Sequence, residues 1–170
     1  PEHGYSFGAE LTSAFTTGFV NSAAYADITR GKNNFGLEYN LNLRNYNNRI
    51  INKRYEYDFD NVHYISDETQ KDHFGYTTQN ITTRYSNSQM GKYAFQAKLK
   101  LEINNSFSDG NGTSIFNQGS LQTSDGTIHN RASDYVSPTL DLYYSKNLGQ
   151  KDELSLNVVG SHYDTNSTQY

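Results

Sequence analysis

The sequence predicts an all-β protein made of antiparallel strands. Apolar and polar residues alternate with a period of two in several segments, and no segment shows the period near 3.6 of an amphipathic helix. In FGLEYNLNLRNY, residues 35–46, the odd positions from Phe35 to Leu43 are apolar or aromatic, whereas the even positions are Gly, Glu, Asn or Arg. Links rich in Gly, Asn, Ser and Lys separate these segments, as hairpin turns require.

About seven strands are expected, in the order 4–11, 18–28, 35–46, 77–85, 93–104, 135–144 and 153–163. The segments 18–28 and 77–85 alternate less regularly than the others. From residue 28 onward the links alternate in length: 30–34, 86–92 and 145–152 are short, whereas 47–76 and 108–134 are predicted to be long loops. Outer-membrane barrels have short turns on one side and long loops on the other, so this asymmetry fits such a barrel.

Composition narrows the class of protein. The 170 residues suit a single domain over 1–170, and 15 Tyr with 9 Phe indicate a folded chain although only 34% of residues are hydrophobic. A net charge of -4 without a basic cluster argues against a nucleic-acid partner. The chain has no Cys, which excludes disulfides and thiolate metal sites. Apolar runs are too short for a membrane-spanning helix, so only strands could cross a membrane.

The uncharged sides of the strands could face a protein core or lipid. The segments 35–46 and 93–104 keep their alternation over the roughly 9 to 11 residues that a lipid-spanning strand needs. Their apolar sides carry no charge, and aromatic residues lie near strand ends, where they would sit at the headgroup level. These end residues are Phe35, Tyr46, Tyr85, Tyr93 and Tyr144. Together the three features favour a transmembrane β-barrel.

Two segments carry a resemblance to a known family. They are AFTTGFVNSAAYADITRGKNNFGLEYNLNLRNYNNR and SPTLDLYYSKNLGQKDELSLNVVGSHYDTN. In order along the chain, the TTGF hairpin, the Tyr39 to Arg49 run, the LDLYY strand and the Leu154 to Gly160 strand resemble the barrel of TonB-dependent outer-membrane receptors from Bacteroidota. Residues 50–74 and 108–134, within the two long links, show no match to that family.

The resemblance implies a barrel of 22 antiparallel strands, an N-terminal plug, and energised uptake of a siderophore, glycan or peptide. This chain is expected to be a segment of such a barrel in the bacterial outer membrane, without the plug, the TonB-contacting segment or the last strand. Its implied partners are outer-membrane lipid, the plug and remaining barrel of the same protein, TonB through segments outside this chain, and a nutrient. Neither an enzymatic activity nor a cofactor is expected.

Two alternatives remain open. A complete barrel of eight strands with a structural or adhesion role would suit the length. A soluble β-sandwich that binds carbohydrate would place the apolar sides between two sheets.

Two sets of candidate ligand contacts follow from the barrel interpretation. The polar sides of the strands would line the lumen, where they would contact the plug or a ligand: Glu38, Asn40, Asn42, Arg44, Gln96, Lys98, Lys100 and Glu102. In the first outer loop, aromatic residues and a histidine could stack on a sugar: Tyr55, Tyr57, Phe59, His63 and Tyr64.

The acidic residues of the same loop could bind a cation or sugar, although simple solvation is the better interpretation: Asp58, Asp60, Asp67, Glu68 and Asp72. The five His residues are interpreted as surface loop residues, because they share no metal-ligand spacing. No catalytic motif is present.

Overall fold

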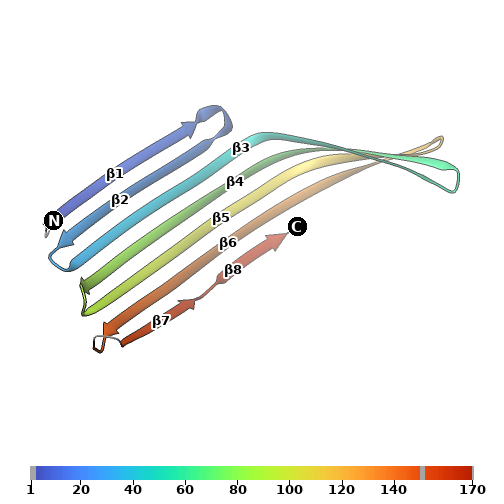
Figure 1. Cartoon of the computed structure of the whole chain (residues 1–170). Coiled ribbons are helices and arrows are strands. Elements are labelled where there is room, and N and C mark those ends of the chain that lie inside the picture. The colour runs from blue at the N-terminus through green and yellow to red at the C-terminus, as the bar shows by residue number, and fades with distance from the viewer. Residues whose placement is uncertain (1–2, 150–151, 170) are drawn as a thin grey trace.

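The computed structural model of the chain describes residues 3–149 and 152–169. These residues form one antiparallel sheet of eight strands, and the predicted all-β fold is therefore confirmed (Figure 1). A short 3-10 turn, Phe15–Thr17, joins the first two strands. The strands are β1 His3–Ala14, β2 Phe19–Arg30, β3 Asn33–Phe59, β4 Val62–Gln89, β5 Tyr93–Gln118, β6 Leu121–Asn147, β7 Glu153–Ser161 and β8 Asp164–Gln169.

The sheet is a chain of hairpins, because each strand from β1 to β6 pairs with the next one in sequence. Among the described residues β1 does not pair with β7 or β8, so the sheet is open. No helix within 3–149 or 152–169 is both long and apolar enough to cross a bilayer.

The eighth strand was not expected, because DTNSTQ lacks apolar alternation. It pairs with β6 at Arg131–Val136, beyond the pairing of β7 with Thr139–Asn147. The interruption between β7 and β8 lies opposite Pro138, which has no N–H to donate to a ladder. The His162 amide instead donates to the Pro138 carbonyl at 3.0 Å.

The prediction of long loops at 47–76 and 108–134 was wrong. Both segments continue the sheet, so β3 to β6 are each 26 to 28 residues long. Tight turns close them: Asp60 and Asn61 have φ values of 51° and 58°, and Gly119 has a φ of 58°. We call residues 49–72 and 109–130 the extension and the rest of the sheet the body; Figure 1 shows the extension projecting past the other strands.

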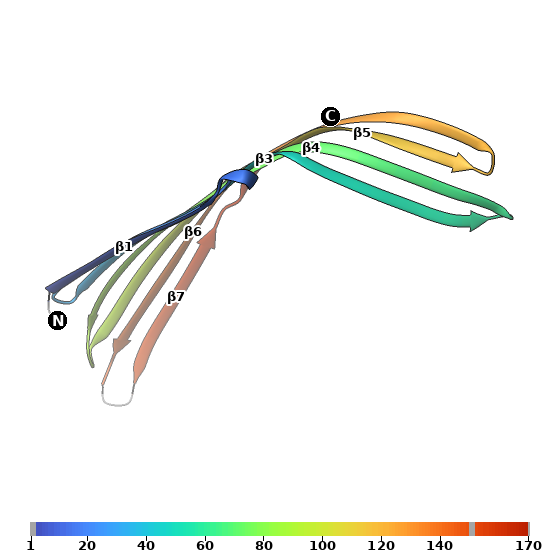
Figure 2. The same cartoon turned by 90° about the horizontal axis from the view of Figure 1, so that it is seen from above.

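The sheet bends where the body meets the extension (Figure 2). At this bend Tyr46 pairs with Phe74 and Arg49 pairs with Asp72, so Asn47 and Asn48 lie opposite the single residue His73. This is a β-bulge, which bends the strand that carries it. It also shifts the alternation of β3 by one residue, so that odd residues of β3 change face at the bend.

The register places the apolar sides of the body strands on one face, which we call the apolar band. One row of paired residues illustrates it and runs Tyr5, Ile28, Phe35, Tyr85, Ala97, Leu142 and Val158. Tyr46 lies on the opposite face, because it pairs with Phe74, and so it cannot belong to the aromatic rim predicted for the apolar side.

No second layer among the described residues covers the apolar band. Among the described residues no hydrophobic side chain is fully buried, and Phe7 and Leu11 remain 75% and 72% exposed. A protein of this size ordinarily buries a substantial apolar core. The described residues therefore form one uncovered sheet, without the second sheet that a β-sandwich requires.

Candidate functional site

The eight candidate lumen residues all lie on the face opposite the apolar band, which we call the polar face. Register places them there: Glu38 pairs with Thr82 and Lys100, while Asn40 pairs with Asn80 and Glu102. Three of the eight take part in ion pairs: Glu38 pairs with Arg84 at 3.4 Å, and Lys100 pairs with Glu102 at 3.1 Å. The common face predicted for Glu38, Asn40, Asn42, Arg44, Gln96, Lys98, Lys100 and Glu102 is thus observed.

Four of the five candidate outer contacts also share the polar face, now on the extension. Tyr55, Tyr57 and Phe59 pair with Ser66, Tyr64 and Val62, and the bulge brings these odd residues of β3 to the same face as the even residues of the body. The Tyr57 and Tyr64 rings stack with centroids 5.0 Å apart and planes 8° from parallel. Phe116 of β5 adds a third ring, 5.8 Å from Tyr64.

His63 does not belong to this aromatic group, contrary to the sequence prediction. It lies on the other face, where Nδ1 is 2.6 Å from Asp58 and Nε2 is 3.0 Å from Glu56. The hydrogen bond with Asp58 is the main cause that holds the pKa of His63 above its ordinary value. The five residues were also expected on an irregular loop, whereas they lie on β3 and β4.

The acidic residues of the extension do not gather into one site. Asp67 and Asp58 lie on the face with His63, where Asp67 is 3.5 Å from Arg54. Glu68 and Asp72 lie on the polar face, each opposite a cation of β3. Across the parts of the chain that the structure describes, no three His, Asp or Glu residues form a group that could hold a metal ion.

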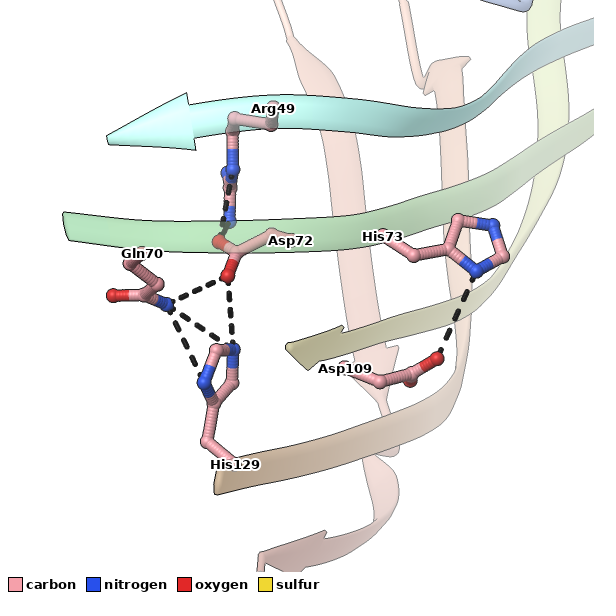
Figure 3. A network of polar contacts seen from close by, with 6 residues as sticks. All are labelled: Arg49, Gln70, Asp72, His73, Asp109 and His129. Atoms are coloured by element: carbon pink, nitrogen blue, oxygen red, sulfur yellow. Dashed lines mark hydrogen bonds and ion pairs between the residues drawn. The ribbon is translucent and has the colours of Figure 1, made fainter. Parts of the chain in front are cut away.

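The most completely formed polar cluster surrounds Asp72 (Figure 3). Arg49 of β3 donates from both Nε and Nη2 to Asp72 Oδ2, with Nε at 3.1 Å. Gln70 donates to Asp72 Oδ1 at 2.8 Å, and His129 Nε2 of β6 lies 3.3 Å from the same oxygen. The carboxylate side chain has no solvent exposure. Hydrogen bonds and charges from these neighbours must therefore offset the free-energy cost of removing it from water.

Gly110 of β5 makes room for this cluster. A Cβ at Gly110 would contact Asp72 Oδ1 and would lie 2.5 Å from the Lys71 carbonyl oxygen and 2.8 Å from His129 Cε1. Because the residue has no side chain, His129 can reach across β5 to Asp72. On the reverse face, the neighbouring pair His73 and Asp109 stays outside this cluster, with Nδ1 and Oδ2 3.7 Å apart (Figure 3).

The pKa of Asp72 reflects two opposed effects. Burial alone would raise the pKa of this carboxyl, because it disfavours the charged form. Hydrogen bonds from Arg49 and Gln70, together with the charges of Arg49 and His129, outweigh burial and hold the pKa below its ordinary value. Asp72 is therefore a fixed anion at neutral pH.

A hollow of about 460 Å³ lies beside this cluster at the bend, and most of its lining residues belong to the polar face. Three small residues of β5 and β6, Ser106, Ser108 and Ser133, line it on the polar face beside the bulky Tyr76 and Phe74 of β4. Sequence reasoning missed this hollow and the Asp72 cluster. The segments that form most of both, within 47–76 and 108–134, show no sustained alternation of apolar residues. The sequence therefore does not indicate which of their residues lie opposite each other.

Comparison with known proteins gives no independent assignment: no protein-family model matches the sequence, and no curated protein is detectably similar to it. The resemblance to TonB-dependent receptors therefore stays an expectation from the quoted segments.

Proposed function

We propose that this chain is part of the wall of an outer-membrane β-barrel, in a TonB-dependent receptor that imports a bulky nutrient. The apolar band contacts lipid, the polar face lines the lumen or contacts a plug, and the extension stands on the outer side. In this proposal the short turns at 31–32 and 90–92 lie on the periplasmic side, since all four long strands project at the opposite end. The full barrel of 22 strands, the plug and TonB are taken from the resemblance.

The observation that carries the proposal is the slant of the apolar band across the sheet. At the end with short turns, one row of paired residues reads Arg30, Asn33, Asn87, Phe95, Tyr144 and Leu156. At the other end a row reads Val20, Leu43, Thr77, Asn105 and Asp134. The first row is polar on β2 and β3 but apolar on β5 and β6, and the second row is the reverse. The apolar band therefore lies one row closer to the short turns on β5 and β6 than on β2 and β3.

This slant is what a lipid slab requires of barrel strands. Strands of a closed barrel tilt by about 35 to 45° from the axis, so a layer of constant height crosses successive strands at shifted positions. From Phe35 to Leu43 and from Phe95 to Ile103 the band covers about nine residues, close to the length needed for the hydrocarbon layer.

The outward face also changes character where the band ends. Beyond the bend it carries Arg54, Glu56, Asp58, His63 and Asp67, which form ion pairs and hydrogen bonds on an exposed surface. Charged side chains on a lipid-facing surface are costly, whereas they are ordinary in water. The bend therefore supports an assignment of the outer boundary of the lipid layer.

Site-specific labelling tests the orientation. Single cysteines replace Leu37 and Leu101 on the apolar band, and Asn40 and Asn80 on the polar face, each labelled with an environment-sensitive fluorophore in the full-length protein in phosphatidylcholine vesicles. We expect brominated lipid to quench the labels at 37 and 101 and to leave those at 40 and 80 nearly unchanged. Equal quenching on both faces, or partition of the protein into buffer without detergent, would contradict the wall assignment.

Transport is tested separately in host cells that lack the protein. Uptake of the nutrient should be lower in these cells than in wild-type cells. Collapse of the proton-motive force should lower uptake in wild-type cells to the same level. A deletion strain with unchanged uptake of all nutrients but altered surface attachment would instead support a structural or adhesion barrel.

A further inference from the structure

We propose that the hollow at the bend binds the carboxylate of an acidic sugar, such as a uronate, through Arg131. This inference rests on the proposed receptor function and specifies the class of solute. A hollow of about 460 Å³ lies within the size range of small-molecule sites. Its lining combines two guanidinium groups, aromatic rings and several hydroxyls, which together match an anionic carbohydrate.

The two arginines of the hollow have different roles. Arg49 is already held by Asp72 and lies over the Phe74 ring, with Cζ 4.3 Å from the ring centroid. Arg131 is exposed and forms no ion pair within the described part of the chain. Arg49 is therefore held in place as part of the lining. Arg131 can donate two parallel N–H groups of its planar guanidinium to a carboxylate.

The acidic residues next to the hollow do not compete for Arg131. Asp109 and Asp134 neighbour lining residues in sequence, but they lie on the reverse face, where Asp109 approaches His73 and Asp134 accepts from Asn105. Asp72, the acid on the polar face at this level, is engaged by Arg49. The hollow thus carries excess positive charge although the whole chain is acidic, with a net charge of -4.

The remaining lining residues suit a sugar better than a bare anion. Tyr76 lines the hollow, and its ring can pack against the apolar side of a pyranose. Ser108 and Ser167 place hydroxyls next to the same space, and hydroxyls can both donate and accept with sugar hydroxyls. A small inorganic anion would leave most of this space unfilled.

The test measures binding by titration calorimetry with the full-length protein folded in detergent, so that transport is not required. The probes are digalacturonate, its methyl ester, in which the carboxylates are neutral, and acetate. We expect digalacturonate to bind at least about tenfold more tightly than the ester. Arg131→Gln should weaken digalacturonate binding by about tenfold. Arg131→Lys should restore part of it, and acetate should bind far more weakly than the sugar acid.

Two further variants distinguish binding in the hollow from general attraction of an anion to the positive charges of the polar face. Ser108→Phe fills the hollow while it keeps Arg131, and should abolish digalacturonate binding. Lys53→Gln removes a positive charge elsewhere on the polar face, opposite Glu68, and should leave binding unchanged. The heat-dependent shift in gel mobility of a folded barrel shows whether each variant is folded.

Equal binding of the ester and the acid, or equal losses in Lys53→Gln and Arg131→Gln, would overturn the proposal. So would a wild-type protein that binds no digalacturonate while Arg131→Gln lowers its melting temperature, because Arg131 would then pair with a carboxylate of the polypeptide. Binding of the acid without any uptake would overturn the transport role alone. Uptake of a neutral nutrient without acid binding would overturn this inference alone.

Discussion

At the scale of single residues, the absence of a side chain at Gly110 decides whether the Asp72 cluster can form. Gly110→Ala would place a methyl group against Asp72, His129 and the backbone of Lys71, none of which can withdraw without loss of hydrogen bonds. We expect a destabilisation of the extension of about 1 to 3 kcal/mol, as for other overpacked sites. Hydrogen exchange of the β4 and β5 amides of the extension measures this loss.

Gly126→Ala is the matched control, because nothing lies within 4 Å of a Cβ at that position on β6. Its amide exchange should stay at the wild-type rate. Equal exchange in the two alanine variants would show that the packing of Asp72 over Gly110 contributes nothing to the extension.

The charge of Asp72 leads to a pH dependence. Because its pKa in the folded protein is lowered, its contribution to stability is complete above the ordinary carboxyl pKa of 3.8 and is lost as pH falls through the lowered value. Exchange protection of the extension should therefore fall on acidification below about pH 4. In Asp72→Asn the same protection should already be lower at pH 7 and should change less with pH.

Asp67→Asn serves as the control for this titration, because that carboxylate pairs with Arg54 on an exposed surface. Exposed pairs contribute little, so its pH profile should follow that of the wild type. An Asp72→Asn profile as steep as the wild-type profile would assign the acid sensitivity to other groups.

At the scale of the strands, the sequence predicts the body well and the extension poorly, for a physical reason. In the body, one face is apolar, so apolar residues recur at every second position from Phe35 to Leu43 and reveal the strand. In the extension both faces carry polar residues, and the strands are held by backbone ladders and cross-strand pairs such as Arg49 with Asp72. Backbone pairing leaves no period in the sequence, so the segments resemble loops.

The bulge at Asn47 and Asn48 conceals the site further. Alternation counted from Phe35 would place Tyr55 and Tyr57 on the same face as Leu37, whereas the added residue moves them to the polar face. His63 was grouped with these rings because it is close in sequence, yet neighbours on a strand point to opposite faces. The candidate lumen residues needed no such correction, since no bulge interrupts the ladder between them.

The turn at the end of β3 closes the hairpin that β3 and β4 form in the extension. Asp60 and Asn61 both have positive φ, a conformation that Asn and Gly tolerate and β-branched residues do not. We expect Asn61→Val to destabilise the β3–β4 hairpin of the extension by about 1 to 2 kcal/mol. Faster trypsin cleavage after Lys53 and Arg54 would report the opening.

Asn61→Gly is the control for the turn, since Gly adopts this φ without strain. Its cleavage rate should equal the wild-type rate or lie below it. Cleavage of Asn61→Val at the rate of Asn61→Gly would indicate that the ladder, and not the turn, determines the stability of the hairpin.

At the scale of the whole molecule, the uncovered apolar band determines the environment in which the sheet can exist. Leu101 lies in the middle of the band, and Asn80 lies on the polar face opposite Asn40 and Glu102. If lipid covers the band, Leu101→Arg should cost about 2 to 4 kcal/mol of folding free energy in a bilayer, whereas Asn80→Arg should be tolerated beside Glu102. The folded fraction of each full-length variant in phosphatidylcholine vesicles, followed by gel mobility over a urea series, measures the difference. If the band is exposed to water, both substitutions should be tolerated. If it packs against protein, Leu101→Arg should be as destabilising in detergent-free buffer as in the bilayer. Either result would exclude lipid as the neighbour of the band.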